Sequence, residues 1–199
     1  MDLLKLKEKL ESNGFKAVVF ETRKEAADYL NSEIDGKTVG FGGSVGLKDM
    51  GLHESLAEHN EVHYHGAAED AAKEMMIIQN TDVYLLTANA VAEDTGEIIN
   101  IDGTGNRVSS SLFGHKKVYF VVGKNKISPD YESALSRARN VVAPKNAQRL
   151  NRKTPCAAKA DRCYNCNSPE RICNGLVVLY KKMYSQEMEV VLVNEEIGY

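Results

Sequence analysis

Four cysteines have the spacing that most directly predicts chemistry in this chain. They are Cys156, Cys163, Cys166 and Cys173, in the pattern C-x6-C-x2-C-x6-C, and the sequence has no others. A two-residue gap is typical of metal binding, because a tight turn directs both sulfur atoms at one metal. Four thiolates suit tetrahedral zinc or an iron–sulfur cluster. The alternative is a loop with free thiols or a chance disulfide, since the outer spacings match no standard zinc finger.

The cysteines lie in a basic segment of an otherwise acidic protein. The chain of 199 residues has a formal net charge of −3, but Lys and Arg dominate residues 145–175. The basic residues there are Lys145, Arg149, Arg152, Lys153, Lys159, Arg162 and Arg171, opposed by Asp161 and Glu170. Positive charge of this kind offsets the excess negative charge of a thiolate site. It also suits an acidic protein partner, so the segment is a candidate for both roles.

A second candidate site begins at a glycine-rich loop. Residues 38–46 read TVGFGGSVG, with Gly42, Gly43 and Ser44 at the end of the predicted strand. Glycine lets main-chain N–H groups approach a ligand closely, and a following helix N-terminus favours an anion. The loop matches neither a Walker loop nor the GxGxxG fingerprint. A tight strand-to-helix turn is therefore the alternative to anion binding.

A further group of polar residues follows the most apolar segment, VYLLT at residues 83–87. The candidates for ligand binding are Asn89, Asn100, Asp102, Gly103, Gly105, Asn106 and Arg107. Glu93 and Asp94 are the candidates for acid–base catalysis, which needs burial or a like charge to raise the pKa of one carboxyl group. Arg107 suits a carboxylate or phosphate, because its guanidinium is a planar fork. The alternative is that Asp102, Asn106 and Arg107 satisfy one another and the loop.

Predicted strands and helices alternate along most of the chain. Strands are predicted at residues 16–20, 38–42, 62–65, 83–87, 97–101, 118–123 and 141–143. Helices are predicted at residues 2–12, 21–30, 67–79, 107–113 and 128–140, with a turn and helix within 45–56. Asn106 and Ser128 are the expected N-caps, with Pro129 in the first helical position. The alternation favours an α/β fold, with a mostly parallel sheet and helices on both faces.

The last third of the chain departs from this pattern. Residues 145–175 show no clear periodicity and are expected to form a Cys-containing insertion. Residues 176–180 and 189–193 are expected to be C-terminal edge strands that pair antiparallel. We expect residues 1–199 to form a single domain that opens with an amphipathic helix in residues 1–14. Ligands bind beyond the carboxyl ends of strands in such sheets, so the two polar segments are expected to share one cavity.

Three stretches of sequence resemble the LUD domain family, the lactate-utilisation proteins. They are VGFGGSVGL at residues 39–47, TDVYLLTANAVAEDTGEIINIDGTGNRVSS at residues 81–110, and VVLVNEEIG at residues 190–198. The resemblance implies the Rossmann-like open sheet of the superfamily of sugar-phosphate isomerases and CoA transferases. It also implies a role in oxidation of L-lactate to pyruvate, alongside iron–sulfur partner proteins. Because such systems handle electrons, the analogy favours an iron–sulfur cluster over zinc at the four cysteines.

A weaker resemblance to the methylthioribose-phosphate isomerases supports the same superfamily. In that pattern an acidic residue stands where this chain has Asn89, and an amide cannot act as a general acid or base. Two alternatives to lactate utilisation stay open. One is a non-catalytic iron–sulfur electron-transfer or scaffold subunit, and the other is a phosphosugar isomerase-like enzyme that uses Glu93 or Asp94.

Composition argues against several other classes of protein. The hydrophobic fraction of 43% is that of a globular protein, and no apolar run approaches the roughly 20 residues of a membrane helix. The net charge argues against nucleic acid as a partner. The N-terminus has no signal-peptide pattern, so a cytoplasmic location with reduced cysteines is expected. The expected partners are a small anionic metabolite, iron–sulfur redox proteins and, in a homo-oligomer, further copies of the chain.

Overall fold

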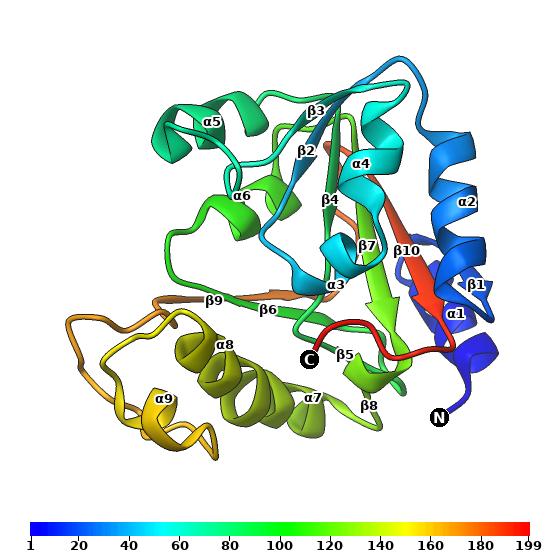
Figure 1. Cartoon of the computed structure of the whole chain (residues 1–199). Helices are drawn as coiled ribbons and strands as arrows, with labels where there is room; N and C mark the ends of the chain where they lie inside the picture. Colours follow the sequence, from blue (N-terminus) through cyan, green and yellow to red (C-terminus); the bar gives the residue numbers. More distant parts are fainter.

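A six-stranded parallel sheet forms the centre of the molecule (Figure 1). The computed structural model describes all 199 residues. The strands of this sheet are β1 (Lys16–Phe20), β2 (Thr38–Phe41), β3 (Glu61–His63), β4 (Val83–Leu86), β7 (Lys117–Gly123) and β10 (Glu187–Val193). They lie in the order β1-β10-β7-β4-β2-β3, and every neighbouring pair runs parallel. The predicted α/β fold with a Rossmann-like sheet is therefore confirmed.

Alternate residues of the central strands enter two different hydrophobic cores. In β4, Tyr84 and Leu86 face one core, whereas Val83 and Leu85 face the other. All four side chains are buried. A parallel sheet that is covered on both faces needs apolar residues along the whole strand, which explains the continuous apolar run at this position.

Three helices cover one face of the sheet. They are α2 (Arg23–Glu33), α3 (Val45–Asp49) and α4 (Leu52–Ala57), and all their leucines are fully buried. Helix α2 begins with a capping box: the Thr22 hydroxyl accepts the Glu25 N–H, and the Glu25 carboxylate accepts the Thr22 N–H. Local caps and burial of leucine together account for this layer.

The other face carries helices and a second, smaller sheet. The helices are α1 (Leu3–Ser12), α5 (Ala71–Ile78) and α6 (Asn106–Leu112). The second sheet has the order β8-β5-β6-β9, with β8 (Ile127–Ser128), β5 (Ala90–Ala92), β6 (Ile98–Asp102) and β9 (Gly175–Leu179). Its residues Val91 and Ile98 share a core with Phe120 of β7, so the two sheets pack as adjacent layers.

A long, interrupted helix covers the outer face of the second sheet. Helix α7 (Tyr131–Arg137) continues through a π-helical turn (Ala138–Val142) into α8 (Ala143–Arg149), and α9 (Pro155–Lys159) follows. The side chains of Ala134 and Ala138 pack with Ile99 of β6. Figure 1 shows α7, α8 and α9 together on one side of the molecule, away from α2. None of the helices in the structure has the length and apolar character needed to span a bilayer.

The structure corrects the prediction for the segment after β8. Asp130 caps α7, because its carboxylate accepts the Ser133 N–H at 2.7 Å. The prediction that Ser128 and Pro129 begin this helix is therefore wrong, and Ser128 belongs to β8. The predicted strand at 141–143 is also wrong, because those residues are helical. Burial of Ala138 and Val142 outweighs the low helix propensity of valine in this turn, whereas Val141 is exposed.

The two late strands do not pair with each other, contrary to the prediction. Strand β9 lies at the edge of the second sheet, antiparallel to β6, whereas β10 lies between β1 and β7. Residues 188–193 of β10 are all buried, as a central strand requires. Two other segments contain more regular structure than predicted. The polar stretch at 88–96 includes β5, and residues 145–175 include the end of α8 and all of α9.

Candidate functional site

A cavity of about 340 Å³ opens at the carboxyl ends of the parallel strands. Its wall is built by the segments that follow β2, β4, β7 and β10, by the loop between β6 and α6, and by α8. This volume is within the range of metabolite-binding sites. Both polar segments selected from the sequence contribute to it. The selected residues that line the cavity are Gly43, Ser44, Asn89, Asp102, Gly103, Asn106 and Arg107.

The glycine-rich loop after β2 brings main-chain donors to this cavity. The N–H groups of Gly43 and Ser44 donate to no other atom of the chain. The Ser44 hydroxyl accepts the Leu47 N–H at 3.3 Å, so it caps α3. Gly42 packs so closely that a Cβ atom there would lie 3.1 Å from Cγ of Arg107. Glycine at this position therefore lets Arg107 lie directly beside the loop.

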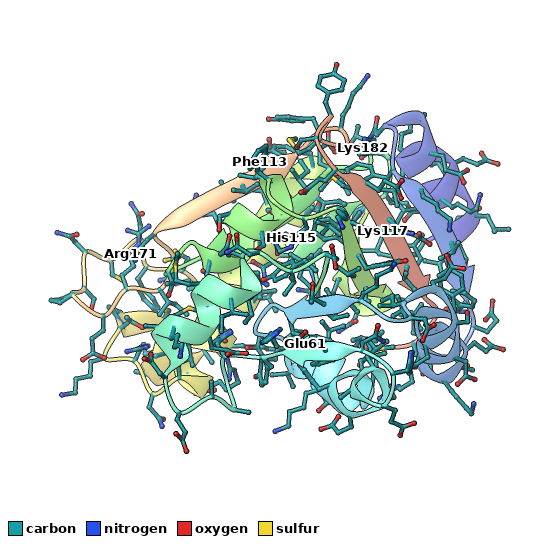
Figure 2. The ribbon with its side chains drawn as sticks, turned by 90° about the horizontal axis from the view of Figure 1, so that it is seen from above. Glu61, Phe113, His115, Lys117, Arg171 and Lys182 are labelled. Carbon is teal, nitrogen blue, oxygen red and sulfur yellow. The ribbon has the colours of Figure 1, made fainter.

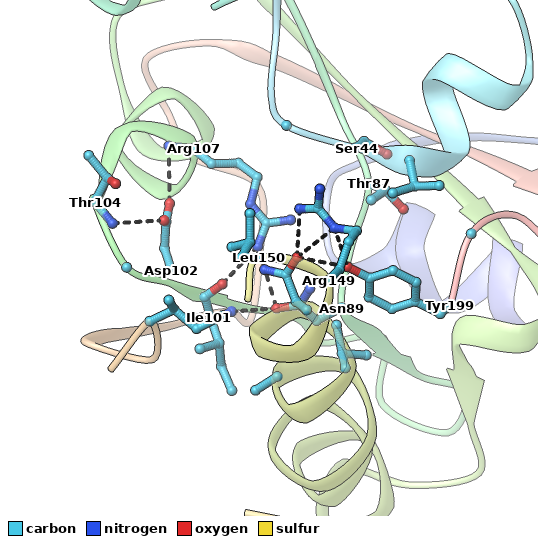
Figure 3. Close-up of a pocket in the computed structure, with 18 of the residues that line it drawn as sticks. Ser44, Thr87, Asn89, Ile101, Asp102, Thr104, Arg107, Arg149, Leu150 and Tyr199 are labelled. Carbon is cyan, nitrogen blue, oxygen red and sulfur yellow. Dashed lines mark hydrogen bonds between the residues drawn. The ribbon is translucent and has the colours of Figure 1, made fainter. Parts of the chain in front are cut away.

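Arg107 is held in place from one side of its guanidinium group. Its Nη2 donates to the Ile101 carbonyl oxygen at 2.8 Å and to Oδ1 of Asn89 at 3.5 Å (Figure 3). Asn89 is itself fixed, because its Oδ1 accepts the Ile101 N–H at 2.6 Å and its N–H donates to Oδ1 of Asn100 at 3.1 Å. The remaining N–H groups of Arg107 are free to bind a ligand in the cavity.

Asp102 is the only side-chain carboxylate that lines the cavity. One oxygen accepts the Thr104 N–H at 3.2 Å, and the other accepts the N–H groups of Arg107 and Val108, each at 3.1 Å (Figure 3). The bonds from Arg107 and Val108 satisfy two N–H groups in the first turn of α6, which have no partner within the helix. Asp102 therefore stabilises its own loop, as the alternative to ligand binding predicted. Main-chain N–H groups already occupy both of its carboxylate oxygens.

Lys126 is a buried cation of the cavity that the sequence analysis did not select. It ends the 3₁₀ turn (Lys124–Lys126) after β7 and is 3% exposed. Its Nζ donates to the main-chain oxygen of Tyr199 at 2.9 Å. Burial, followed by the charges of Arg137 and Arg107, lowers the pKa of Lys126 to about 7. Lys126 lies three residues beyond the apolar strand KVYFVVG (residues 117–123), and its place just past the carboxyl end of that strand is the sequence signal for it.

Arg149 and Arg152 form the exposed rim of the cavity. Nη2 and Nε of Arg149 donate to Oδ1 of Asn146 at 2.7 and 3.2 Å (Figure 3). The Tyr199 hydroxyl donates to the same oxygen at 2.7 Å. Both arginines belong to the basic segment at residues 145–175, and the fold places that part of the segment at the cavity.

Three selected residues, Gly42, Asn100 and Gly105, lie behind the wall and do not line the cavity. Asn100 is buried and supports Asn89 through its amide oxygen. Gly105 holds the N-cap position of α6 with a left-handed φ of 94°, which favours glycine. Asn106 is the first residue of that helix, so the prediction that it is the N-cap is wrong. Unlike Gly42, Asn100 and Gly105, Asn106 does line the cavity.

The two acid–base candidates lie outside the cavity. Glu93 and Asp94 occupy the turn between β5 and β6. The Glu93 carboxylate accepts the Asp2 N–H at 2.7 Å, beside the start of α1, and Asp94 is exposed. The structure therefore does not bring these carboxylates together with the residues around Arg107.

The four cysteines line a second cavity, of about 10 Å³. Cys156 lies on α9, Cys163 and Cys166 lie in the following loop, and Cys173 precedes β9. All four thiols are unpaired and partly exposed. No three His, Cys, Asp or Glu side chains are gathered closely enough to hold a metal ion. Figure 2 shows Arg171 of this segment at the end of the molecule opposite Lys182 and the N-terminal helices.

The fold and the cavity define an α/β protein with a cation-lined site at the carboxyl edge of a parallel sheet. The family model for the LUD domain matches residues 3–193. The chain therefore belongs to the LUD domain family.

A solved structure of a DUF162 family protein from Deinococcus radiodurans is similar over nearly its whole length. The TM-score is 0.58 at 13% identity, covering 96% of this chain and 95% of that one, which supports the fold alone. Ribose 5-phosphate isomerase A from Neisseria gonorrhoeae has a TM-score of 0.36 at 14% identity, over 53% of this chain and 52% of that one. That score is too low to support an argument. No curated protein matches the sequence.

Proposed function

We propose that this LUD domain protein binds a small metabolite through a carboxylate or phosphate group in the cavity at the carboxyl edge of the sheet. The observation that carries this proposal is the charge of the cavity wall. The side-chain cations that line it are Arg107, Lys126, Arg149 and Arg152, and the only side-chain carboxylate is Asp102. Because main-chain N–H groups already occupy that carboxylate, a bound anion is the group that would offset the positive charge.

The cations differ in depth, which suggests where the anionic group binds. Lys126 is 3% exposed and Arg107 is half-buried, whereas Arg149 and Arg152 are exposed. Electrostatic interactions are stronger at the buried end, where water screens less. We therefore place the anionic group between Arg107 and Lys126, with the free N–H groups of Gly43 and Ser44 as further donors. The rim arginines would attract anions to the entrance.

Lactate utilisation is the proposed metabolic setting, with oxidation of lactate to pyruvate as the reaction in which the protein takes part. Membership of the LUD domain family supports this setting. Both acids carry the carboxylate that a guanidinium group binds well. A cavity of about 340 Å³ also accommodates larger anions, so sugar phosphates and coenzyme A belong in the same search.

We assign proton transfer in this cavity to Lys126 rather than to Glu93 or Asp94. A group whose pKa is near 7 gains and loses a proton readily at neutral pH. The two acidic candidates lie in the β5–β6 turn, where Glu93 binds the main chain of Asp2. The isomerase alternative would also need Lys126 for proton transfer, since no free side-chain carboxylate lines the cavity.

Calorimetric titration tests the proposal with L-lactate, pyruvate, ribose 5-phosphate and coenzyme A. For the ligand that binds most tightly, we expect Arg107→Ala to lower the affinity about 10- to 100-fold. The reason is the loss of charge-assisted hydrogen bonds, each of which contributes about 1.5–3 kcal/mol. Lys145→Ala is the matched control, because it removes an exposed charge from α8 without altering the cavity wall.

Two results would contradict the proposal. One is an unchanged affinity in the Arg107→Ala variant. The other is an equal loss of affinity in the Lys145→Ala control, because that result would show a general effect of net charge rather than binding in the cavity.

We also propose a cytoplasmic location and iron–sulfur redox proteins as partners. The four unpaired cysteines support a reducing compartment. The exposed rim arginines offer an acidic partner a docking surface next to the ligand. Alkylation of thiols in rapidly quenched cells tests the location: reduced cysteines are expected, and recovery of the protein with disulfides would contradict it.

A further inference from the structure

We propose that Cys156, Cys163, Cys166 and Cys173 bind a single zinc ion in the small cavity that they line. This site is separate from the anion-binding cavity and does not depend on its function. The cysteines extend from residue 156 to residue 173 and come from a helix, a loop and the segment before β9, yet all four reach one cavity. Four soft thiolates are a donor set that zinc prefers.

The C-x2-C turn and the start of α9 place polar groups next to two of the sulfur atoms. The Asn165 N–H donates to Sγ of Cys163 at 3.3 Å. Asn165 has a left-handed φ of 47°, which tightens the turn and directs this N–H at the sulfur. The Thr154 hydroxyl lies 3.3 Å from Sγ of Cys156, so a second sulfur also has a polar contact. Contacts of this kind orient the sulfur atoms that would bind a metal.

Two arginines offset the charge that such a site would carry. Four thiolates around Zn²⁺ leave two excess negative charges, and Arg139 and Arg171 line the same cavity. Nη1 of Arg171 donates to the Cys166 carbonyl oxygen at 2.8 Å, and its Nε donates to that of Cys173 at 2.9 Å. Arg171 therefore joins the main chains of two cysteines as well as supplying charge.

The small volume of the cavity that all four cysteines line favours one ion over a cluster, although Cys163 and Cys173 also line a neighbouring cavity of about 220 Å³. A volume of about 10 Å³ is close to the space that one water-sized sphere needs. A single zinc ion fits this space, whereas a four-iron cluster is several times larger. The geometry therefore favours zinc, although the family analogy favours iron and sulfide.

Formation of the site requires only local movement. The four sulfur atoms line the cavity without converging on one point. A cysteine side chain has a single rotatable bond to its sulfur, and residues 160–174 form no helix or strand. Rotation of the thiols with a small shift of this loop would gather them around an ion. Because the ion binds only the gathered arrangement, zinc would stabilise the loop.

Zinc titration of the metal-free, reduced protein against a chromophoric chelator tests the proposal. We expect one zinc ion per chain and protection of four thiols from a thiol reagent. Cobalt(II) in place of zinc should give the visible absorption of a tetrahedral thiolate site. Cys163→Ser should lower zinc affinity about 100-fold or more, with the circular dichroism spectrum retained. Tyr164→Phe is the matched control, since it changes the same turn but keeps every thiol.

Several outcomes would overturn the zinc assignment. Failure of the reduced protein to bind zinc is one, and equal zinc affinity in the Cys163→Ser variant is another. Assembly of a brown cluster from ferrous iron and sulfide under anaerobic conditions, in a protein that binds no stoichiometric zinc, would replace zinc by an iron–sulfur centre. The cobalt spectrum of the unaltered chain keeps the test valid even where the serine variant fails to fold.

Discussion

Burial of Lys126 should lower the stability of the folded protein, although the same residue is proposed to bind the ligand. Lys126→Met removes the buried charge and preserves the length of the side chain. We expect this variant to raise the free energy of unfolding at pH 7 by roughly 1–3 kcal/mol, because desolvation of the ammonium group is no longer required. Urea denaturation measures this change, and Lys145→Met, at an exposed position, is the control. A loss of stability in the Lys126→Met variant would contradict this explanation of its pKa.

The same residue predicts a pH dependence of stability. The pKa of Lys126 is about 7 in the folded protein, and its ordinary value is 10.5. Between these values the unfolded chain binds more protons, so this residue's contribution to stability should rise as the pH increases from about 7. Below about pH 7 both states are protonated and the contribution is constant. Urea denaturation above about pH 7 should show this rise in stability for the unaltered protein and not for the Lys126→Met variant.

Anion binding should have the opposite dependence on pH. A bound anion favours the protonated form of Lys126, so binding above about pH 7 requires uptake of a proton. Affinity should therefore be constant below about pH 7 and fall as the pH rises beyond it. Calorimetry in two buffers with different ionisation enthalpies measures the proton uptake directly. A pH-independent affinity would show that the anion does not contact Lys126.

Some residues of the site could be predicted from sequence and others could not. Arg107 reaches the cavity after β6, an antiparallel strand of the second sheet. Gly43 and Ser44 follow from a general rule, because the carboxyl ends of parallel strands meet at one edge of a sheet. Lys126 obeys the same rule, but its burial depends on contact with the main chain at Tyr199, which is remote in sequence. Glu93 has the right chemistry for a catalyst, but a short strand directs its turn toward the start of α1.

At the scale of the elements, β10 shows how a charged residue can occupy a central strand. Glu189 is fully buried, and it forms ion pairs with Lys117 at 2.9 Å and Lys16 at 3.2 Å. It also accepts a hydrogen bond from the Tyr29 hydroxyl at 2.5 Å. Figure 2 shows Lys117 at the start of its strand, within the body of the molecule. These contacts tie β1, β7, β10 and α2 together.

Glu189→Ala should therefore destabilise the protein by about 3–5 kcal/mol, because Lys117 would lose a buried partner. Glu187→Ala is the matched control on the same strand: its side chain is exposed, and we expect a change within about 0.5 kcal/mol. Urea denaturation of both variants gives the comparison. Equal stability of the two variants would show that the buried ion pairs do not support the sheet.

Strand existence was easier to predict than strand pairing. The apolar runs at β4, β7 and β10 indicate strands because both faces are buried. The last two strands are close in sequence, which favours an antiparallel pairing, but β10 is apolar without a break from Val190 to Val193. Such a pattern is typical of a central parallel strand, so the apolar run of β10 is a better guide to its pairing than its closeness to β9 in the sequence. The helical turn around Val142 depends on packing and gives no comparable signal in the sequence.

At the scale of the whole molecule, the two cavities share a wall. Ala143 and Ile172 line both. The segment before β9 is joined to the loop after β6, because the Asn174 N–H donates to the Asp102 carbonyl oxygen at 2.9 Å and its side chain donates to that of Gly103 at 3.0 Å. The loop that carries Cys173 therefore also positions the loop that leads to the anion-binding cavity.

Gly103→Ala should impair both sites together. A Cβ atom at this position would lie 2.9 Å from the main-chain oxygen of Ile172, so the shared wall must move. We expect zinc affinity and anion affinity to fall together, each about 3- to 10-fold. Gly175→Ala is the control, since its Cβ atom would lie 3.9 Å from the nearest neighbour. Titration of both ligands into both variants measures the coupling, and a loss confined to one ligand would show that the sites are independent.

A crystal structure with the tightest-binding anion from the calorimetric screen tests the proposed anion site directly. The carboxylate or phosphate group of the ligand should lie within hydrogen-bonding distance of Arg107 and Lys126, at the buried end of the cavity. An anionic group found on another face of the protein, or a cavity that contains only water at a saturating ligand concentration, would contradict it.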